Sequence, residues 1–177
     1  MSHANRQILA TVLCGLILVV IFAQVNHILA SRHVSLWVGG LVVTFASLRL
    51  GYREGLIAVL VLGWFQDALS PVTFGLHAFL FATAHAVIYY IRNRFPREEN
   101  LIGILVALLA NLGLFLVFSF TQIGDSPMPG QVWIRLLVDL GLSQVVIALI
   151  TPWFIGLQER ALDIAGAGLR NEQRGVM

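Results

Sequence analysis

The chain contains no lysine, and its only cysteine is Cys14. A single thiol excludes an intramolecular disulfide and a thiolate metal cluster, so we interpret Cys14 as a packing residue within an apolar segment. The sequence also lacks the phosphate-binding glycine loop that ends in lysine, and it contains no Gly-x-Ser-x-Gly nucleophile motif. These absences remove the usual signatures of phosphoryl transfer and of serine hydrolysis, and we expect no enzyme activity and no cofactor.

Charge of either sign is scarce. Of the 177 residues, 11% are charged and 58% are hydrophobic, and the mean hydropathy is +0.86. These values lie outside the range of ordinary soluble domains and are typical of an integral membrane protein. The arginines are dispersed through short segments rather than gathered into a basic stripe, so we expect no binding to nucleic acid.

Six long apolar segments account for most of the chain. Each approaches the length of about 20 residues that crosses about 30 Å of hydrocarbon. Their length and their lack of strict alternation predict helices rather than barrel strands, because lipid cannot satisfy an exposed backbone. The segments are residues 8–25, 34–50, 55–69, 74–91, 101–120 and 132–155. We therefore predict an all-α integral membrane protein, a compact bundle of six transmembrane helices joined by short loops.

The end of the chain is more polar. We expect Pro152 to bend or end the last apolar helix, because proline cannot donate the backbone hydrogen bond of a helix interior. Beyond it, Leu157, Ala161 and Ile164 recur at helical spacing and predict a short amphipathic helix on the cytoplasmic surface. Residues 1–155 are thus assigned to the six-helix transmembrane domain, and residues 156–177 to an amphipathic tail whose last seven residues we expect to be disordered.

The positions of the arginines predict the orientation. Cytoplasmic loops of membrane proteins carry an excess of basic residues. With the N-terminus inside, two arginines face outward, Arg32 and Arg135, and nine face the cytoplasm: Arg6, Arg49, Arg53, Arg92, Arg94, Arg97, Arg160, Arg170 and Arg174. Both termini of this multi-pass chain are therefore expected in the cytoplasm.

A glycine-rich region, residues 51–77, carries the first candidate site. Gly55 and Gly63 predict close helix packing. Asp67 is the only acidic residue of segment 55–69 and lies one turn before its outer end. Two interpretations stay open: Asp67 pairs with an outer arginine, a helix N-terminus or a partner subunit, or it is an interfacial acid that only ends the helix. Phe74 and Gly75 begin the next helix, whose unpaired N–H groups offer Asp67 hydrogen bonds.

Two histidines lie on segment 74–91. His77 and His85 are eight residues apart, which places them about 80° apart around a helix. That spacing is poor for two ligands of one metal, and the His-Glu-x-x-His pattern of zinc proteases is absent. We expect ordinary hydrogen-bonded intramembrane histidines and no metal site.

The last apolar segment presents a polar stripe, formed by Gln131, Arg135, Asp139 and Ser143 at four-residue spacing. Arg135 and Asp139 are placed to form an (i, i+4) ion pair. The stripe is expected to avoid lipid, either as an internal salt bridge near the outer interface or by facing the bundle interior, a hydrated cavity or another transmembrane helix. Asn111, in the middle of segment 101–120, is the expected hydrogen-bonding partner of the stripe.

The region from residue 51 to residue 91 resembles the rod shape-determining protein MreD family of bacteria. In that family glycines lead into an aspartate, and a Phe-Gly-Leu sequence opens the next helix. The matching residues here are Gly55, Gly63, Asp67, Phe74, Gly75 and Leu76. Chain length and short-looped architecture are also similar to the family.

This resemblance implies a non-enzymatic inner-membrane subunit of the cell-elongation machinery. Such a subunit would bind the single-pass protein MreC and, through it, act with MreB, RodA and a penicillin-binding protein in peptidoglycan synthesis and cell-shape control. The implied fold is similar to the substrate-binding subunit of energy-coupling-factor transporters. The faces around Asp67, Phe74 and Gly75 and around Arg135 and Asp139 would be the docking surfaces.

The implied fold also suggests an alternative function. In a vitamin-binding transporter subunit, the polar stripe and His77 would line a pocket for a small ligand. Co-purification with a single-pass partner would favour the first function, and ligand-dependent thermal stabilisation would favour the second.

Overall fold

The computed structural model describes residues 2–70, 72–94, 100–123 and 129–168, and within these ranges the chain is helical without a strand. Two short 3₁₀ helices, η1 (Ala30–Arg32) and η2 (Arg92–Arg94), follow α1 and α4. The α-helices are α1 (His3–Leu29), α2 (Gly39–Arg49), α3 (Tyr52–Leu69), α4 (Leu76–Ile91), α5 (Asn100–Ile123) and α6 (Pro129–Ile164).

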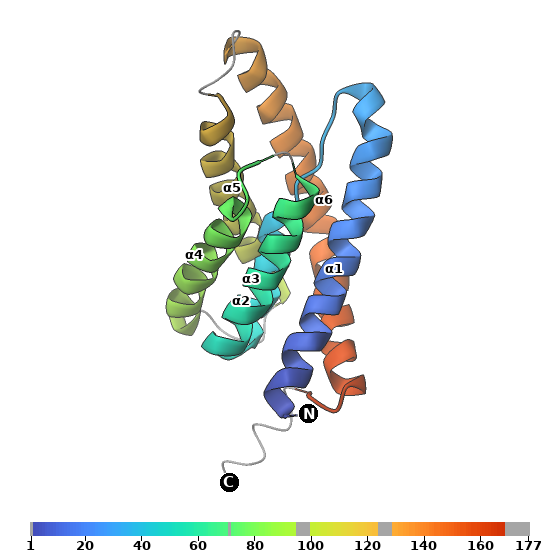
Figure 1. Cartoon of the computed structure of the whole chain (residues 1–177), viewed down its shortest axis with the longest axis vertical. Helices are drawn as coiled ribbons and strands as arrows, with labels where there is room; N and C mark the ends of the chain where they lie inside the picture. The colour runs from blue at the N-terminus through green and yellow to red at the C-terminus, as the bar shows by residue number, and fades with distance from the viewer. Residues whose placement is uncertain (1, 71, 95–99, 124–128, 169–177) are drawn as a thin grey trace.

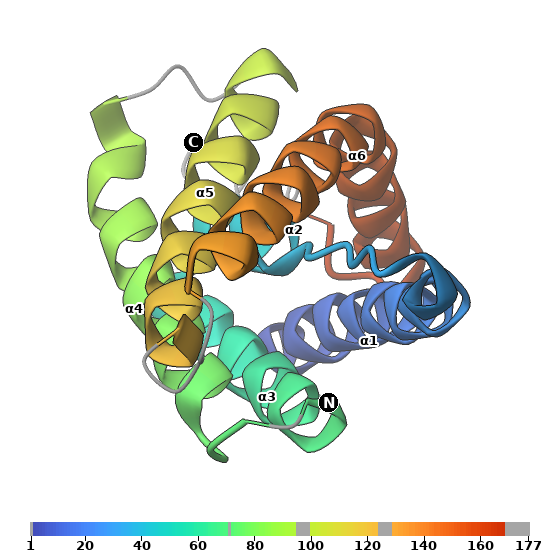
Figure 2. The ribbon, with the colours of Figure 1, turned by 90° about the horizontal axis from the view of Figure 1, so that it is seen from above.

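The helices are arranged as a ring around α2. Going round the ring, α1 packs against α3, α3 against α4, α4 against α5, α5 against α6, and α6 returns to α1. The central helix contacts all five others, and Figure 2 shows it enclosed by them when the molecule is seen from above. Residues 39–47 of α2 are all buried, as expected for a helix that is apolar on every side.

Among the described residues, three helical stretches are long and apolar enough to cross a membrane: His3–Arg32, Leu101–Phe120 and Trp133–Ile164. The central helix is different, because its 11 residues extend only about 17 Å at 1.5 Å per residue. The sequence predicted a helix over residues 34–50, but residues 34–38 are not helical. We call residues 34–38 the lead-in segment. It descends to the buried start of α2, visible in light blue in Figure 1.

Glycines allow the backbones to approach closely at the centre. A Cβ atom added to Gly40 of α2 would lie 2.2 Å from the backbone nitrogen of Asn111 in α5. On α3, a Cβ atom at Gly63 would lie 2.4 Å from Cα of Ala78, and one at Gly55 would lie 2.4 Å from Cε1 of His85. In lipid, helices associate through van der Waals packing rather than through the hydrophobic effect, and small residues allow the close approach that this packing needs.

The last helix is longer than the sequence predicted. It contains Pro152 and continues to Ile164 instead of ending near residue 155. Proline lacks the N–H that would bond the carbonyl of Ala148, four residues earlier. The hydroxyl of Thr151 bonds the neighbouring carbonyl, that of Ile147, at 2.6 Å, and the helix continues through the proline. The expected amphipathic helix is therefore the end of α6 itself.

The two ends of the described chain lie together. Gln7 of α1 donates a hydrogen bond of 3.4 Å to the carbonyl of Ala167, and Arg6 reaches the carbonyl of Ala165 at 3.5 Å. Figure 1 shows the start of α1 and the end of α6 side by side at one end of the molecule. The final residues that we expected to be disordered lie outside the described ranges.

Candidate functional site

Asp67 caps a helix to which it does not belong. Its side chain is buried at the end of α3, with a relative exposure of 4%. Oδ2 accepts hydrogen bonds from the backbone N–H groups of Gly75 at 2.9 Å and Ala78 at 3.3 Å, and Oδ1 accepts from that of His77 at 2.9 Å. These N–H groups have no partner inside α4. A negative charge is stabilising at this end of the helix, because the helix dipole makes it partly positive. Of the interpretations left open by the sequence, the helix N-terminus is therefore the partner found.

His77 completes this cap. Its Nδ1 atom lies 2.8 Å from Oδ1 of Asp67, and because an ionised carboxylate only accepts, Nδ1 carries the hydrogen. The imidazole is 1% exposed and packs 5.0 Å, centroid to centroid, from Phe118 of α5. His77 is thus held inside the bundle, where it ties the α3–α4 turn to α5.

Gly75 and Phe74 form the tip of the same turn. Gly75 has φ of +98°, a left-handed conformation that glycine adopts without the steric cost of a side chain. The preceding side chain, Phe74, is 73% exposed. Gly63 seats α3 against the start of α4, and Asp67 bonds the N–H of Gly75. The start of α4 is therefore anchored to α3, and Phe74, directly before Gly75, is exposed.

The polar stripe of α6 binds the lead-in segment. Asp139 accepts hydrogen bonds from the backbone N–H of Ser35 at 3.1 Å and from the hydroxyl of Ser35 at 2.9 Å. One turn further, Ser143 accepts from the N–H of Trp37 at 2.9 Å. Non-helical backbone at membrane depth is stable only where the protein itself supplies such partners. The stripe therefore replaces the helical hydrogen bonds that the lead-in segment does not form.

Arg135 contributes less than the sequence suggested. Its Nε atom is 3.9 Å from Oδ2 of Asp139, and its side chain is 57% exposed. An ion pair with one partner this exposed contributes about 0–1 kcal/mol. Because Ser35 supplies the short contacts to Asp139, the carboxylate does not depend on the arginine. Gln131, the fourth member of the stripe, has a side chain outside the described part of the structure.

Two asparagines complete the binding of the lead-in segment and the start of α2. Asn26 of α1 forms a reciprocal pair with Leu36, donating to its carbonyl at 2.8 Å and accepting from its N–H at 2.7 Å. Asn111 of α5 accepts from the N–H of Gly40 at 3.2 Å. The expectation that Asn111 bonds the α6 stripe is wrong, because its amide faces the first turn of α2 instead.

The other end of α2 is capped by Arg92. Its Nη1 atom donates to the carbonyls of Ser47, Leu48 and Leu50 at 3.0, 3.4 and 2.7 Å, and its guanidinium lies 3.9 Å from the ring centroid of Tyr89. These carbonyls belong to the unpaired C-terminal turn of α2, where a positive charge is favourable. Sequence analysis counted Arg92 only as a cytoplasmic charge.

His85 lies beside this cap. Its Nε2 atom is 3.1 Å from the carbonyl of Tyr52, and its Nδ1 atom is 3.0 Å from the hydroxyl of Ser47. Because a carbonyl only accepts, Nε2 carries the hydrogen. The Ser47 hydroxyl also donates to the carbonyl of Val43 at 2.8 Å, so its one hydrogen serves both that carbonyl and the contact with Nδ1. Within the described ranges no three His, Cys, Asp or Glu side chains converge on a metal position. Both histidines therefore bond to their own chain.

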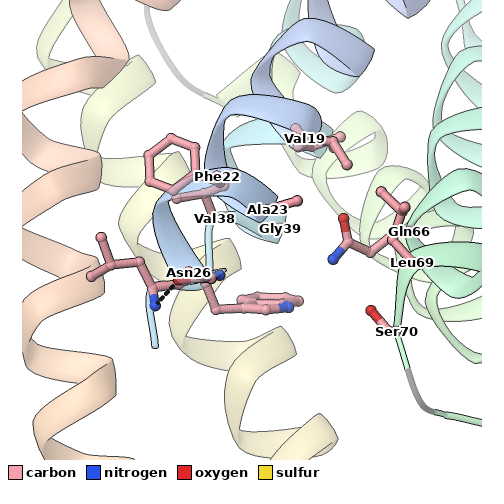
Figure 3. Close-up of a pocket in the computed structure, with 12 residues that line it drawn as sticks. Val19, Phe22, Ala23, Asn26, Val38, Gly39, Gln66, Leu69 and Ser70 are labelled. Carbon is pink, nitrogen blue, oxygen red and sulfur yellow. Dashed lines mark hydrogen bonds between the residues drawn. The ribbon is translucent and has the colours of Figure 1, made fainter. Parts of the chain in front are cut away.

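A cavity of about 200 Å³ lies between α1, the start of α2 and the end of α3. Figure 3 shows Phe22 and Asn26 of α1 on one side of it, and on the other Gln66 of α3 and Ser70, which directly follows α3. The transporter alternative expected a pocket lined by His77 and the α6 stripe. None of those residues lines this cavity, and it is smaller than the about 300–1,000 Å³ of sites that enclose small-molecule ligands.

Comparison of the chain with protein-family models, with curated proteins and with solved structures finds no match in any of the three.

Asn26 and Arg92 are the site residues that sequence analysis missed. The available signal was weak: Asn26 is a polar residue near the end of a long apolar helix, and Arg92 directly follows one. Such positions are typical of helix ends at an interface. Which backbone groups they bind depends on the way in which other helices pack, and that is not visible in the local sequence.

Proposed function

We propose that this chain is a non-enzymatic scaffold subunit of the bacterial cell-elongation complex, similar to the MreD family, which binds an MreC-like single-pass membrane protein. The observation that carries the proposal is the α3–α4 turn. The motif residues Gly63, Asp67 and Gly75 converge on that turn, and each has a structural role there. If the α3–α4 turn binds the partner, the motif residues are expected to be the ones that build this turn.

Phe74 is the proposed contact residue. It is the motif member that packs least against the chain, since 73% of its surface is exposed, while the residues around it hold its backbone in place. Aromatic anchors on rigid elements bind partners at a low entropic cost because little is immobilised on association. The partner's transmembrane helix would lie against this turn, with MreB, RodA and a penicillin-binding protein acting through that partner.

The proposed location is the bacterial inner membrane, with six crossings and both chain ends in the cytoplasm. Two observations support this orientation. The ends of the described chain lie together at one end of the bundle, and nine of the eleven arginines fall on that side when six segments are threaded. The lead-in segment and α2 would together make the second crossing.

A transporter function receives less support. The His77 imidazole bonds the Asp67 carboxylate, and Asp139 and Ser143 accept from backbone N–H groups of the lead-in segment, so a ligand would have to compete with those contacts. In the scaffold function these buried groups are structural. Asp139 and Ser143 hold the lead-in segment before α2, and His77 helps Asp67 to hold the start of α4.

The test is co-purification from bacterial inner membranes in a mild detergent, with the tagged chain as bait. The wild type should retain a single-pass protein with a large periplasmic region, and Phe74→Ala should reduce its recovery at least several-fold. Phe79→Ala is the matched control, because Phe79 is also a largely exposed phenylalanine, 68% exposed, one turn into α4. Equal recovery with both variants would reject Phe74 as the contact, and a bait that retains no such partner would reject the scaffold role.

A further inference from the structure

The cavity between α1, the start of α2 and the end of α3 has hydrogen-bonding groups without partners. Within the described part of the chain, no hydrogen bond is made by the indole N–H of Trp37, the amide of Gln66 or the hydroxyl of Ser70, and all three residues line the cavity. Figure 3 shows the Gln66 amide and the Ser70 hydroxyl facing the space in front of α1. The polar atoms of these three side chains are not among the fully buried, unpartnered atoms of the described residues, so they are accessible from the cavity and can bond a molecule that enters it.

The backbone adds two more donors. Val38 and Gly39 also line the cavity and are buried, and their N–H groups find no acceptor among the described residues. The N–H groups of Ser35, Leu36, Trp37 and Gly40, on either side, all have one. The N–H groups of Val38 and Gly39 thus differ from those directly before and after them, and the partner that they lack is a hydrogen-bond acceptor.

The chemistry of the walls narrows the ligand class. No charged residue lines the cavity, and Val19, Phe22 and Leu69 make much of its surface apolar. The ligand group is therefore a neutral acceptor attached to an apolar body. At about 200 Å³ the cavity holds roughly the share of liquid volume of seven water molecules, so only part of a larger molecule enters it. Leu69, 53% exposed, marks an opening toward the surface.

The depth of the cavity agrees with one such molecule. The 18 residues of α3 extend about 27 Å, close to the hydrocarbon thickness of a bilayer. Ser70 follows directly and, in the six-crossing arrangement proposed above, would lie where hydrocarbon meets the polar headgroups. We propose that the cavity binds the glycerol-ester region of a diacyl phospholipid, whose ester carbonyls accept from Trp37, Gln66 and the start of α2. The acyl chains leave past Leu69, and the headgroup stays in the interface.

This site does not depend on the scaffold function. It concerns the outer-leaflet side of the bundle in the orientation proposed above, and a chain with another partner would bind the same lipid. A partner's side chain in the cavity is the competing occupant, and the purified chain without a partner separates the two.

Thermal unfolding of the delipidated full chain in detergent is the test. A diacyl phosphatidylethanolamine is titrated, and in parallel a dialkyl ether analogue with the same headgroup and chain length but no ester carbonyls. The diacyl lipid should raise Tm saturably, because a ligand that binds only the folded state stabilises it. Its apparent affinity should be at least ten-fold higher than that of the ether lipid.

Two variants localise the effect. Ala23→Leu fills the cavity from α1 and should abolish the preference for the diacyl lipid, and Gln66→Leu, which removes the amide at nearly constant size, should weaken it. Val20→Leu is the matched control, because Val20 is three residues earlier on α1 and 48% exposed, and it does not line the cavity. Equal affinity of the wild type for the two lipids, or an undiminished preference in both cavity variants, would overturn the proposal.

Discussion

Replacing Asp67 with alanine removes one carboxylate that serves three backbone N–H groups and the imidazole of His77. Two of these N–H groups, on His77 and Ala78, are buried and would find no water. A stranded buried donor costs about 1–3 kcal/mol, whereas polar contacts inside membranes average nearer 1 kcal/mol. We therefore expect Asp67→Ala to lower the free energy of unfolding by about 2–4 kcal/mol. Asp67→Asn, which keeps one acceptor oxygen, should cost about half as much.

The assay is thermal unfolding in detergent, followed by tryptophan fluorescence and far-UV circular dichroism. At about 2–4 °C per kcal/mol for a chain of this size, Asp67→Ala should lower Tm by roughly 4–16 °C. Asp163→Ala is the control, because Asp163 is an exposed acid near the end of α6 and its loss should change Tm by no more than about 2 °C. If Asp67→Ala unfolds no earlier than Asp163→Ala, the carboxylate does not hold the turn and the reasoning fails.

Three further predictions use the same unfolding measurement. Arg135→Leu should lower the free energy of unfolding by less than about 1 kcal/mol, and Asp139→Ala should lower it by about 2–3 kcal/mol. Equal losses in the two variants would mean that the ion pair, and not Ser35, holds the carboxylate. Gly63→Ala should cost about 1–3 kcal/mol because its Cβ meets α4. Gly113→Ala, which meets nothing within 4 Å, should be neutral or slightly stabilising, and the reverse order would refute the proposed helix crossing. Arg92→Gln should lower the free energy of unfolding by about 1–3 kcal/mol. Arg92→Lys should lower it less, because the three carbonyl bonds come from one nitrogen of the arginine. Equal losses in the two variants would contradict this.

Apolar length predicted α1, α5 and α6 well and the central helix poorly. The long runs in α1, α5 and α6 appear as membrane-length helices, because nothing but a helix satisfies a lipid-exposed backbone. Residues 34–38 are as apolar as a helix would be, yet they are not helical. Hydropathy indicates whether a residue lies in an apolar environment, but not which group bonds its backbone. Here the backbone of residues 34–38 is bonded by Asn26, Asp139 and Ser143 on other helices.

The candidate residues were easier to find than their partners. Asp67, Asp139 and Asn111 stood out because a polar side chain in an apolar helix requires a reason. The reason in each case is a backbone group elsewhere in the chain: the start of α4 for Asp67, the lead-in segment for Asp139 and the start of α2 for Asn111. Side-chain spacing along one helix favoured a pairing between neighbours such as Arg135 and Asp139, and it contains no information about an irregular segment that packs alongside.

Photo-crosslinking from position 74 tests the scaffold function most directly. A photoreactive phenylalanine analogue is placed at Phe74, and in a second protein at Phe79, and the cells are irradiated before the membranes are solubilised. The scaffold account predicts that position 74 joins covalently to a single-pass protein with a periplasmic domain, at a yield several-fold above that of position 79. Crosslinks from position 74 to lipid alone, in cells that make the elongation complex, would contradict it.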